Sequence, residues 1–165
     1  MSDTKHTRDH PPLMGLLDSA AEAYLAEFRR ELEAAGYVDV RPTHGCVFRF
    51  VREDGMRLTE LAMYAGMTKQ SVGELVDDLV GQGYVERIPD PEDRRAKLIC
   101  LTDKGVEAQR KGFGLIDEIE GRWAERFGTE KIAELREILE EIVADVAPHA
   151  VPELSALEAV TGSTR

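Results

Sequence analysis

The stretch "LTELAMYAGMTKQSVGELVDDLVGQGYVERIPDPEDRRAKLICLTDKG", residues 58–105, decides the fold of this chain. Its first part predicts a helix of two turns, opened by Thr59 as an N-cap and closed by Gly66. Thr68 is a second N-cap candidate, and the apolar residues after it recur at the spacing of an amphipathic helix: Val72, Leu75, Val76, Leu79 and Val80. A short helix, a turn that contains glycine and a longer helix together indicate a helix-turn-helix.

Two strand-like runs follow, at residues 84–88 and 96–101, and a charged segment with two prolines joins them. A helix-turn-helix followed directly by a β-hairpin is typical of a winged helix, whose wing reaches DNA beside the groove that the second helix enters. Arg94 and Arg95 at the tip are suited to the negative potential of a narrow minor groove. Asp93 is expected to hold an arginine by a charge-assisted hydrogen bond.

Apolar residues at helical spacing also occur on both sides of this stretch. They predict a long first helix at 13–36, a short helix after Pro42, a fifth helix capped by Thr102 and a sixth capped by Thr129. A chain of 165 residues with 42% hydrophobic content is close to the usual size of one domain. The predicted fold is therefore one mainly helical unit over residues 1–165 with a small β-hairpin.

Composition and charge exclude several classes of protein. The formal net charge of −11 argues against binding a polyanion through overall basicity. No apolar stretch approaches the roughly 18 residues that span a bilayer, and the N-terminus is polar, so we expect a cytoplasmic chain without a membrane partner. Cys46 and Cys100 show no CxxC spacing, so they are expected to be reduced and buried, with oxidant sensing as the alternative. Histidines are too sparse for a zinc site, and neither a catalytic motif nor a cofactor motif is present.

Residues 58–105, together with the helices predicted on either side, resemble the MarR family of bacterial transcription regulators, and the resemblance covers about residues 13–146. It implies a winged-helix homodimer that binds a short pseudo-palindromic operator in double-stranded DNA and usually represses transcription. Residues 13–36 and 102–147 would supply the dimerisation helices, and residues 42–101 the DNA-binding region. Many members release DNA when a small anionic or aromatic effector binds between the dimer helices and the DNA-binding region.

The candidate DNA contacts lie on the outward face of the fourth helix and on the wing. They are Thr68, Lys69, Gln70, Ser71, Gly73, Glu74, Asp93, Arg94 and Arg95. The amides at a helix N-terminus favour phosphate, Gln70 suits adenine, and Lys69 suits phosphate or guanine. Glu74 and Asp78 depart from the family pattern, in which these positions are often basic. They are expected to repel phosphate, although Glu74 can also accept a hydrogen bond from cytosine.

Four residues are candidates for lining an effector site among the first, second and fifth helices: Tyr24, His44, Phe48 and Trp123. Core packing is the alternative for each of them, and for His44 also a local hydrogen bond at the start of a helix. A second function stays open at this point. A winged-helix dimer with an acidic fourth helix could bind a protein partner instead of DNA.

Overall fold

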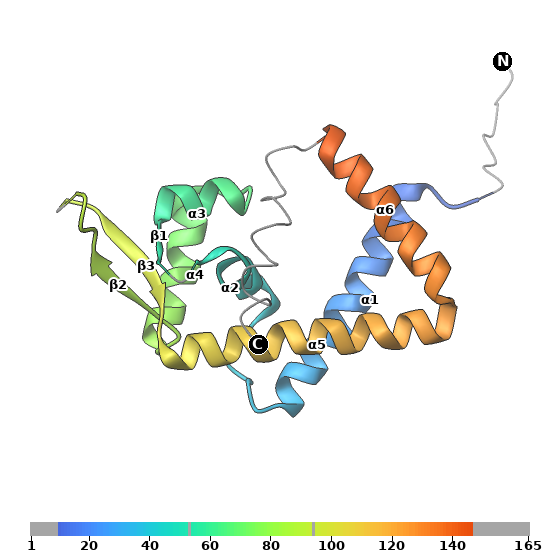
Figure 1. Cartoon of the computed structure of the whole chain (residues 1–165), viewed down its shortest axis with the longest axis horizontal. Helices are drawn as coiled ribbons and strands as arrows, with labels where there is room; N and C mark the ends of the chain where they lie inside the picture. Colours follow the sequence, from blue (N-terminus) through green and yellow to red (C-terminus); the bar gives the residue numbers. More distant parts are fainter. Residues whose placement is uncertain (1–9, 53, 94, 147–165) are drawn as a thin grey trace, which may run out of the picture.

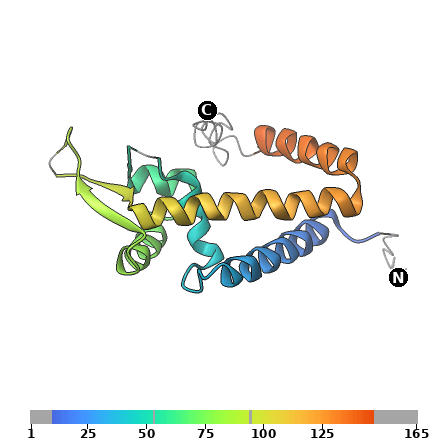
Figure 2. The same ribbon diagram turned by 60° about the horizontal axis from the view of Figure 1, so that its bottom comes forward.

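The computed structural model describes residues 10–52, 54–93 and 95–146 and confirms the mainly helical fold with a small β-hairpin. The chain forms α1 (Leu13–Ala34), the 3-10 turn η1 (Pro42–His44), α2 (Gly45–Phe50), β1 (Met56–Arg57), α3 (Leu58–Tyr64), α4 (Lys69–Gly81), β2 (Val85–Pro89), β3 (Lys97–Leu101), α5 (Asp103–Phe127) and α6 (Thr129–Val146). Helix α5 runs from the base of the hairpin to α6 (Figure 1), and it lies between α1 and α6 (Figure 2). The winged-helix region thus occupies one end of α5 and the other long helices occupy its far half.

The hairpin belongs to a three-stranded antiparallel sheet with the order β1-β3-β2. Strand β1 was not predicted, because two residues are too few to show an alternating pattern. Met56 pairs with Ile99, and both side chains are buried. Gly55 precedes the strand with a φ of +80°, and a Cβ there would lie 2.5 Å from the Sγ of Cys100, so this position requires glycine.

The predicted helix starts are confirmed at two positions and wrong at two. The hydroxyl oxygens of Thr68 and Thr102 each accept a hydrogen bond of 3.1 Å, from the amides of Ser71 and Gly105 respectively. Helix α3 instead begins at Leu58, with Arg57 in the cap position, so Thr59 lies inside the helix. Thr129 is the first residue of α6, and the amide of Ile132 donates to the carbonyl oxygen of Gly128.

The core of the winged-helix region lies between α3, α4 and the sheet. Leu61, Val72, Val76, Leu79 and Ile99 are buried there, which accounts for the apolar spacing of residues 58–101. Within the described residues, no helix is both long and apolar enough to cross a bilayer. Helix α5 is continuous from Asp103 to Phe127 although it contains Gly112, Gly114 and Gly121.

Helix α5 starts in direct contact with Tyr84, the residue before β2. The amide of Thr102 donates to the carbonyl oxygen of Tyr84 over 3.0 Å, and the Thr102 hydroxyl donates to the carbonyl of Gly83 over 2.7 Å. A Cβ on Gly105 would lie 2.0 Å from the same Tyr84 oxygen. Only a residue without a side chain therefore lets the helix approach the hairpin this closely.

We expect Gly105→Ala to lower the free energy of unfolding by about 2–3 kcal/mol, because the clash involves backbone and cannot be relieved by a rotamer change. Gly121→Ala is the matched control in the same helix, since a Cβ at Gly121 meets nothing within 4 Å. The control should be neutral or stabilising by about 0.5–1 kcal/mol. Thermal and urea unfolding measure both variants, and a Gly105→Ala protein as stable as wild type would contradict the close contact.

Candidate nucleic-acid interface

The N-terminal turn of α4 is exposed and capped. The Thr68 oxygen that caps it also lies 2.8 Å from the Ser71 hydroxyl, so these two side chains hydrogen-bond each other at the start of the helix. Lys69 and Gln70 project from the same turn, and both are exposed. An open groove runs along this face between α4 and β2, lined by Leu58, Lys69, Gln70, Gly73, Glu74, Asp77 and Arg87. Four of the predicted contact residues therefore lie together with Asp77 of the same helix face, and Arg87 joins them without having been predicted.

The carboxylates of α4 have partners within the protein. Glu74 accepts a hydrogen bond of 3.3 Å from the side-chain amide of Gln70, and Asp77 pairs with Arg87 over 2.5 Å. Asp78 is turned toward the connection between α1 and α2, where its Oδ2 pairs with Arg41, while its Oδ1 accepts a hydrogen bond from the side chain of Gln82 just after α4. The expectation that Asp78 faces and repels phosphate is therefore corrected, because its charge is used inside the protein.

His44 is fully buried beneath this connection. Its Nδ1 accepts a hydrogen bond of 3.1 Å from the amide of Arg41, so the proton of the neutral ring lies on Nε2. Nε2 then donates to Asp78 over 3.1 Å and ties η1 to α4. Burial lowers the pKa of His44 and the charge of Arg41 lowers it further, while Asp78 acts in the opposite direction. The local hydrogen bond at the helix start is thus the observed role of His44.

The neutral His44 predicts a loss of stability on mild acidification. The unfolded chain takes up a proton near the ordinary histidine pKa of 6.5, whereas the folded protein resists protonation until a lower pH. Stability is therefore complete above about pH 6.5 and falls as the pH drops toward the folded pKa. We expect the Tm to fall between pH 7.5 and 5.5, and His44→Gln to flatten this dependence.

Carboxylates with a lowered pKa, such as Glu27 and Asp90, remain ionised in this interval, so they do not produce the slope. A wild-type Tm that is constant from pH 7.5 to 5.5, or an unchanged slope in the variant, would contradict the assignment.

A buried carboxylate organises the base of the wing tip. Asp90 is 5% exposed, and its Oδ1 accepts hydrogen bonds from the amides of Glu92 and Asp93 at 2.8 and 3.3 Å. Its Oδ2 accepts from the Nε of Arg57 at 2.7 Å, which links the tip to β1. The backbone amide of Glu92 and the guanidinium of Arg57 lower the pKa of Asp90, although burial opposes them. The turn residues of the wing are therefore tied to the short strand next to α3.

Asp93 binds the backbone of the wing turn. Its carboxylate accepts a hydrogen bond of 3.0 Å from the backbone amide of Arg95, which closes a turn and leaves the exposed Arg95 side chain outside that bond. Arg94 lies outside the described residues. Arg57 and Asp90 were not predicted, although an aspartate between two prolines was an available signal.

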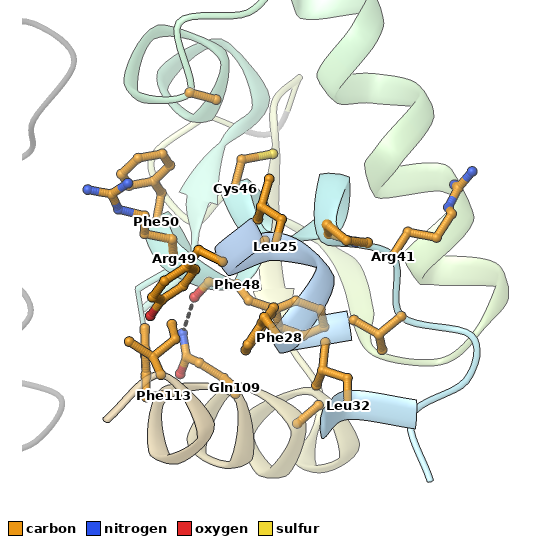
Figure 3. A pocket seen from close by; sticks show the side chains of 18 of the residues that line it. Leu25, Phe28, Leu32, Arg41, Cys46, Phe48, Arg49, Phe50, Gln109 and Phe113 are labelled. Carbon is orange, nitrogen blue, oxygen red and sulfur yellow. Dashed lines mark hydrogen bonds between the residues drawn. The ribbon is translucent and has the colours of Figure 1, made fainter. Parts of the chain in front are cut away.

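A cavity of about 380 Å³ lies among α1, α2, α3 and α5. Its lining includes Tyr24, Leu25, Phe28, Arg41, Cys46, Phe48, Arg49, Phe50, Tyr64, Gln109 and Phe113, and among the described residues no aspartate or glutamate lines it. Figure 3 shows Phe28, Leu25 and Phe48 in the middle, with Arg41 and Arg49 at opposite ends. Gln109 donates to the Phe48 carbonyl over 2.6 Å across one wall.

Two of the four predicted effector residues, Tyr24 and Phe48, line this cavity, whereas His44 and Trp123 do not. Trp123 packs edge-on against Tyr24, with ring centres 5.4 Å apart, and its Nε1 donates to Glu27 over 3.1 Å. Trp123 thus contacts a lining residue from outside.

The two thiols are poorly suited to oxidant sensing. Cys100 is buried, and Cys46 is partly buried in the cavity wall, where its Sγ donates to the carbonyl of Thr43. Burial raises the pKa of both thiols, which disfavours the reactive thiolate. Among the described residues, no group of three or more His, Cys, Asp or Glu side chains could hold a metal ion.

A helix-turn-helix with an adjoining hairpin, an exposed second-helix N-terminus and an arginine on the wing defines a winged helix-turn-helix protein. Residues 38–96 match the model of the MarR family. The chain belongs to this family.

Individual relatives agree with this assignment. The HTH-type transcriptional regulator PetP of Rhodobacter capsulatus is 31% identical over 101 residues, which are 61% of this chain and 60% of the relative's length. The crystal structure of transcriptional regulator PA4135 has 31% identity and a TM-score of 0.66, and the match covers 82% of this chain and 98% of that one. CouR from Rhodococcus jostii RHA1, solved with p-coumaroyl-CoA, has 26% identity, a TM-score of 0.66 and coverage of 81% and 94%.

Proposed function

We propose that this protein is a sequence-specific regulator of transcription that binds operator DNA in the cytoplasm as a homodimer and represses the adjoining promoter. One observation carries the proposal: the exposed N-terminal turn of α4 and its groove lie beside a hairpin whose tip is held in place by Asp90. The relatives PetP and PA4135 are both named as transcriptional regulators. Their names support the same class of function.

In the proposed complex the N-terminal turn of α4 enters the major groove. Lys69 binds a phosphate or guanine, and the side-chain amide of Gln70 pairs with adenine. Glu74 holds the amide of Gln70 at 3.3 Å, which fixes its orientation before DNA arrives. Arg95 and Arg94 of the wing bind the neighbouring minor groove or backbone.

The alternative, a winged helix whose acidic fourth helix binds a protein, is less well supported. Asp78 pairs with Arg41 and accepts hydrogen bonds from His44 and Gln82, so its charge is not available to a basic partner without breaking those contacts. Only Glu74 of the three acidic residues lacks a cationic partner among the described ion pairs. The face that remains carries Lys69 and Gln70, which suit nucleic acid.

Selection of duplexes from a random pool, followed by binding measurements over a range of salt concentrations, tests the proposal. The wild-type protein should enrich a pseudo-palindromic sequence and bind it with a steep salt dependence. Arg95→Ala, and equally Arg94→Ala, should weaken binding to every duplex and reduce the salt slope by about one per protomer. Gln70→Ala should lower the preference for the selected sequence more than the affinity for scrambled DNA. Failure of the wild-type protein to enrich any duplex would refute DNA binding and favour a protein partner.

The dimer is proposed from the apolar surface of the terminal helices. Large apolar side chains are exposed on the surface of α1, at the end of α5 and on α6: Leu13, Met14, Leu16, Leu17, Leu25, Phe127, Leu135, Ile138 and Ile142. So much exposed apolar surface on long helices is typical of an interface. We infer that a second copy covers it, and that a two-fold axis places two α4 helices on successive major grooves.

Ile138→Asp should reduce the fraction of dimer at micromolar concentration, because an aspartate in the interface would be buried without a partner. Val38→Asp is the control, since Val38 is also exposed but lies in the connection between α1 and α2. Light scattering after gel filtration measures both. A fully dimeric Ile138→Asp protein would place the interface elsewhere.

We also propose that the cavity binds a small effector that combines an aromatic ring with an anionic group. Aromatic side chains occupy its middle and two arginines stand at its ends, and the part of its lining that the structure describes carries no carboxylate although the chain as a whole is acidic. The relative CouR was solved with p-coumaroyl-CoA, an aromatic acyl thioester that carries phosphates. Occupation of the cavity would shift α1, α2 and α5 relative to α4 and weaken DNA binding.

Titration with 4-hydroxycinnamate, followed by tryptophan fluorescence, tests the effector site. Trp123 is the only tryptophan of the chain and contacts the lining residue Tyr24, so its emission should change on binding. Arg49→Met should weaken binding about tenfold by removing a charge-assisted contact. Arg126→Met is the matched control. The guanidinium carbon of Arg126 lies 5.2 Å from the ring centre of Phe127, and that of Arg49 lies 5.1 Å from the ring centre of Phe50. Equal affinity in both variants would contradict the proposed anion contact.

A further inference from the structure

Arg87 and Asp77 form an ion pair on the surface proposed to face DNA. Arg87 lies on β2, and its Nη1 is 2.5 Å from the Oδ1 of Asp77 on α4. Both side chains line the groove that also contains Lys69, Gln70 and Glu74. Arg87 is therefore a guanidinium within the proposed interface whose present partner is a carboxylate of the same protein.

The ion pair is accessible to solvent. The side chain of Asp77 is 67% exposed and that of Arg87 is 31% exposed. Exposed ion pairs of this kind contribute little stability, because water screens the attraction and two long side chains must be ordered. A DNA phosphate offers the same guanidinium a second anionic partner with a favourable bidentate geometry. Exchange of the carboxylate for a phosphate therefore has a small cost.

The neighbouring strand residues explain why Arg87 is directed toward α4. Side chains alternate between the two faces of a strand, so Glu86 lies on the opposite face from Arg87. Arg87 pairs in register with Ile99, whose side chain is buried on the side of the sheet that packs against the helices. The sheet thus holds Arg87 beside α4 whether or not Asp77 is its partner.

We propose that Arg87 is a further DNA-binding residue, and that Asp77 holds it in the free protein until a phosphate of the DNA backbone replaces the carboxylate. Asp77 acts as an internal competitor of DNA. It lowers the affinity for duplexes of any sequence, because each binding event must displace it and leave its charge near the phosphates. The proposal rests on the proposed function, since it assigns a role within the same interface.

The test compares four variants with wild type on the selected operator and on a scrambled duplex, across a series of salt concentrations. Arg87→Met should weaken binding to both duplexes and reduce the salt slope by about one per protomer. Arg87→Lys should retain the slope, because lysine still offers a point charge to a phosphate. Asp77→Asn should raise the affinity for both duplexes about fivefold per protomer without reducing the slope. Glu86→Gln removes the same charge from the residue next to Arg87 but releases no arginine, so it should change affinity much less than Asp77→Asn.

The salt slope separates a phosphate contact from a structural role. Thermal unfolding shows whether Arg87→Met is folded, and a folded variant with the wild-type slope would overturn the assignment while leaving the proposed function intact. Equal gains in affinity for Asp77→Asn and Glu86→Gln would show a general charge effect and overturn the role of Asp77. A wild-type protein that binds no duplex would overturn both the proposed function and this inference.

Discussion

The contact between the start of α5 and Tyr84, the residue before β2, fixes the position of the winged-helix region relative to the terminal helices. Tyr84 contributes its carbonyl oxygen to the start of α5, while its hydroxyl donates to Asp39 over 2.8 Å. The ammonium group of Lys104 lies 3.9 Å from the centre of the Tyr84 ring and donates to the carbonyl of Gln82. The hairpin, the connection after α1 and the long helix therefore meet at one aromatic residue. Because α5 continues to α6, the position of the wing relative to the terminal helices is set at this junction.

The acidic composition is compatible with binding a polyanion, because several carboxylates near the proposed interface already have hydrogen-bond or ion-pair partners within the protein. Asp90 accepts hydrogen bonds from backbone amides at the wing base, and Asp78 pairs with Arg41 and accepts a hydrogen bond from His44. Counting charges along α4 therefore overestimates the repulsion that a phosphate would meet. The net charge of −11 describes the whole surface, whereas binding depends on the few groups at the groove.

Most of the fold could be predicted from the sequence because the helices are long and their apolar residues recur regularly. The caps Thr68 and Thr102 were identified because each precedes such a pattern. The caps assigned to Thr59 and Thr129 were wrong by one residue or more, because a neighbouring residue could equally begin the helix. The short strand β1 and the links from Asp90 to Arg57 and from Asp78 to His44 join residues more than 30 positions apart. No local spacing reports contacts of that kind. For the same reason Arg87 was overlooked, since its partner Asp77 lies on a different element.

The central position of β3 has a mechanical consequence for the wing. Since β3 pairs with β1 on one side and β2 on the other, the base of the hairpin cannot bend without breaking hydrogen bonds along both edges. Asp90 also ties the residues after β2 to Arg57 of β1, so the base of the tip belongs to the same unit as the sheet. Strand β1 continues directly into α3, so a force on the wing is transmitted through the sheet to that helix. In the proposed DNA complex, the wing and α3 would therefore move as one rigid body.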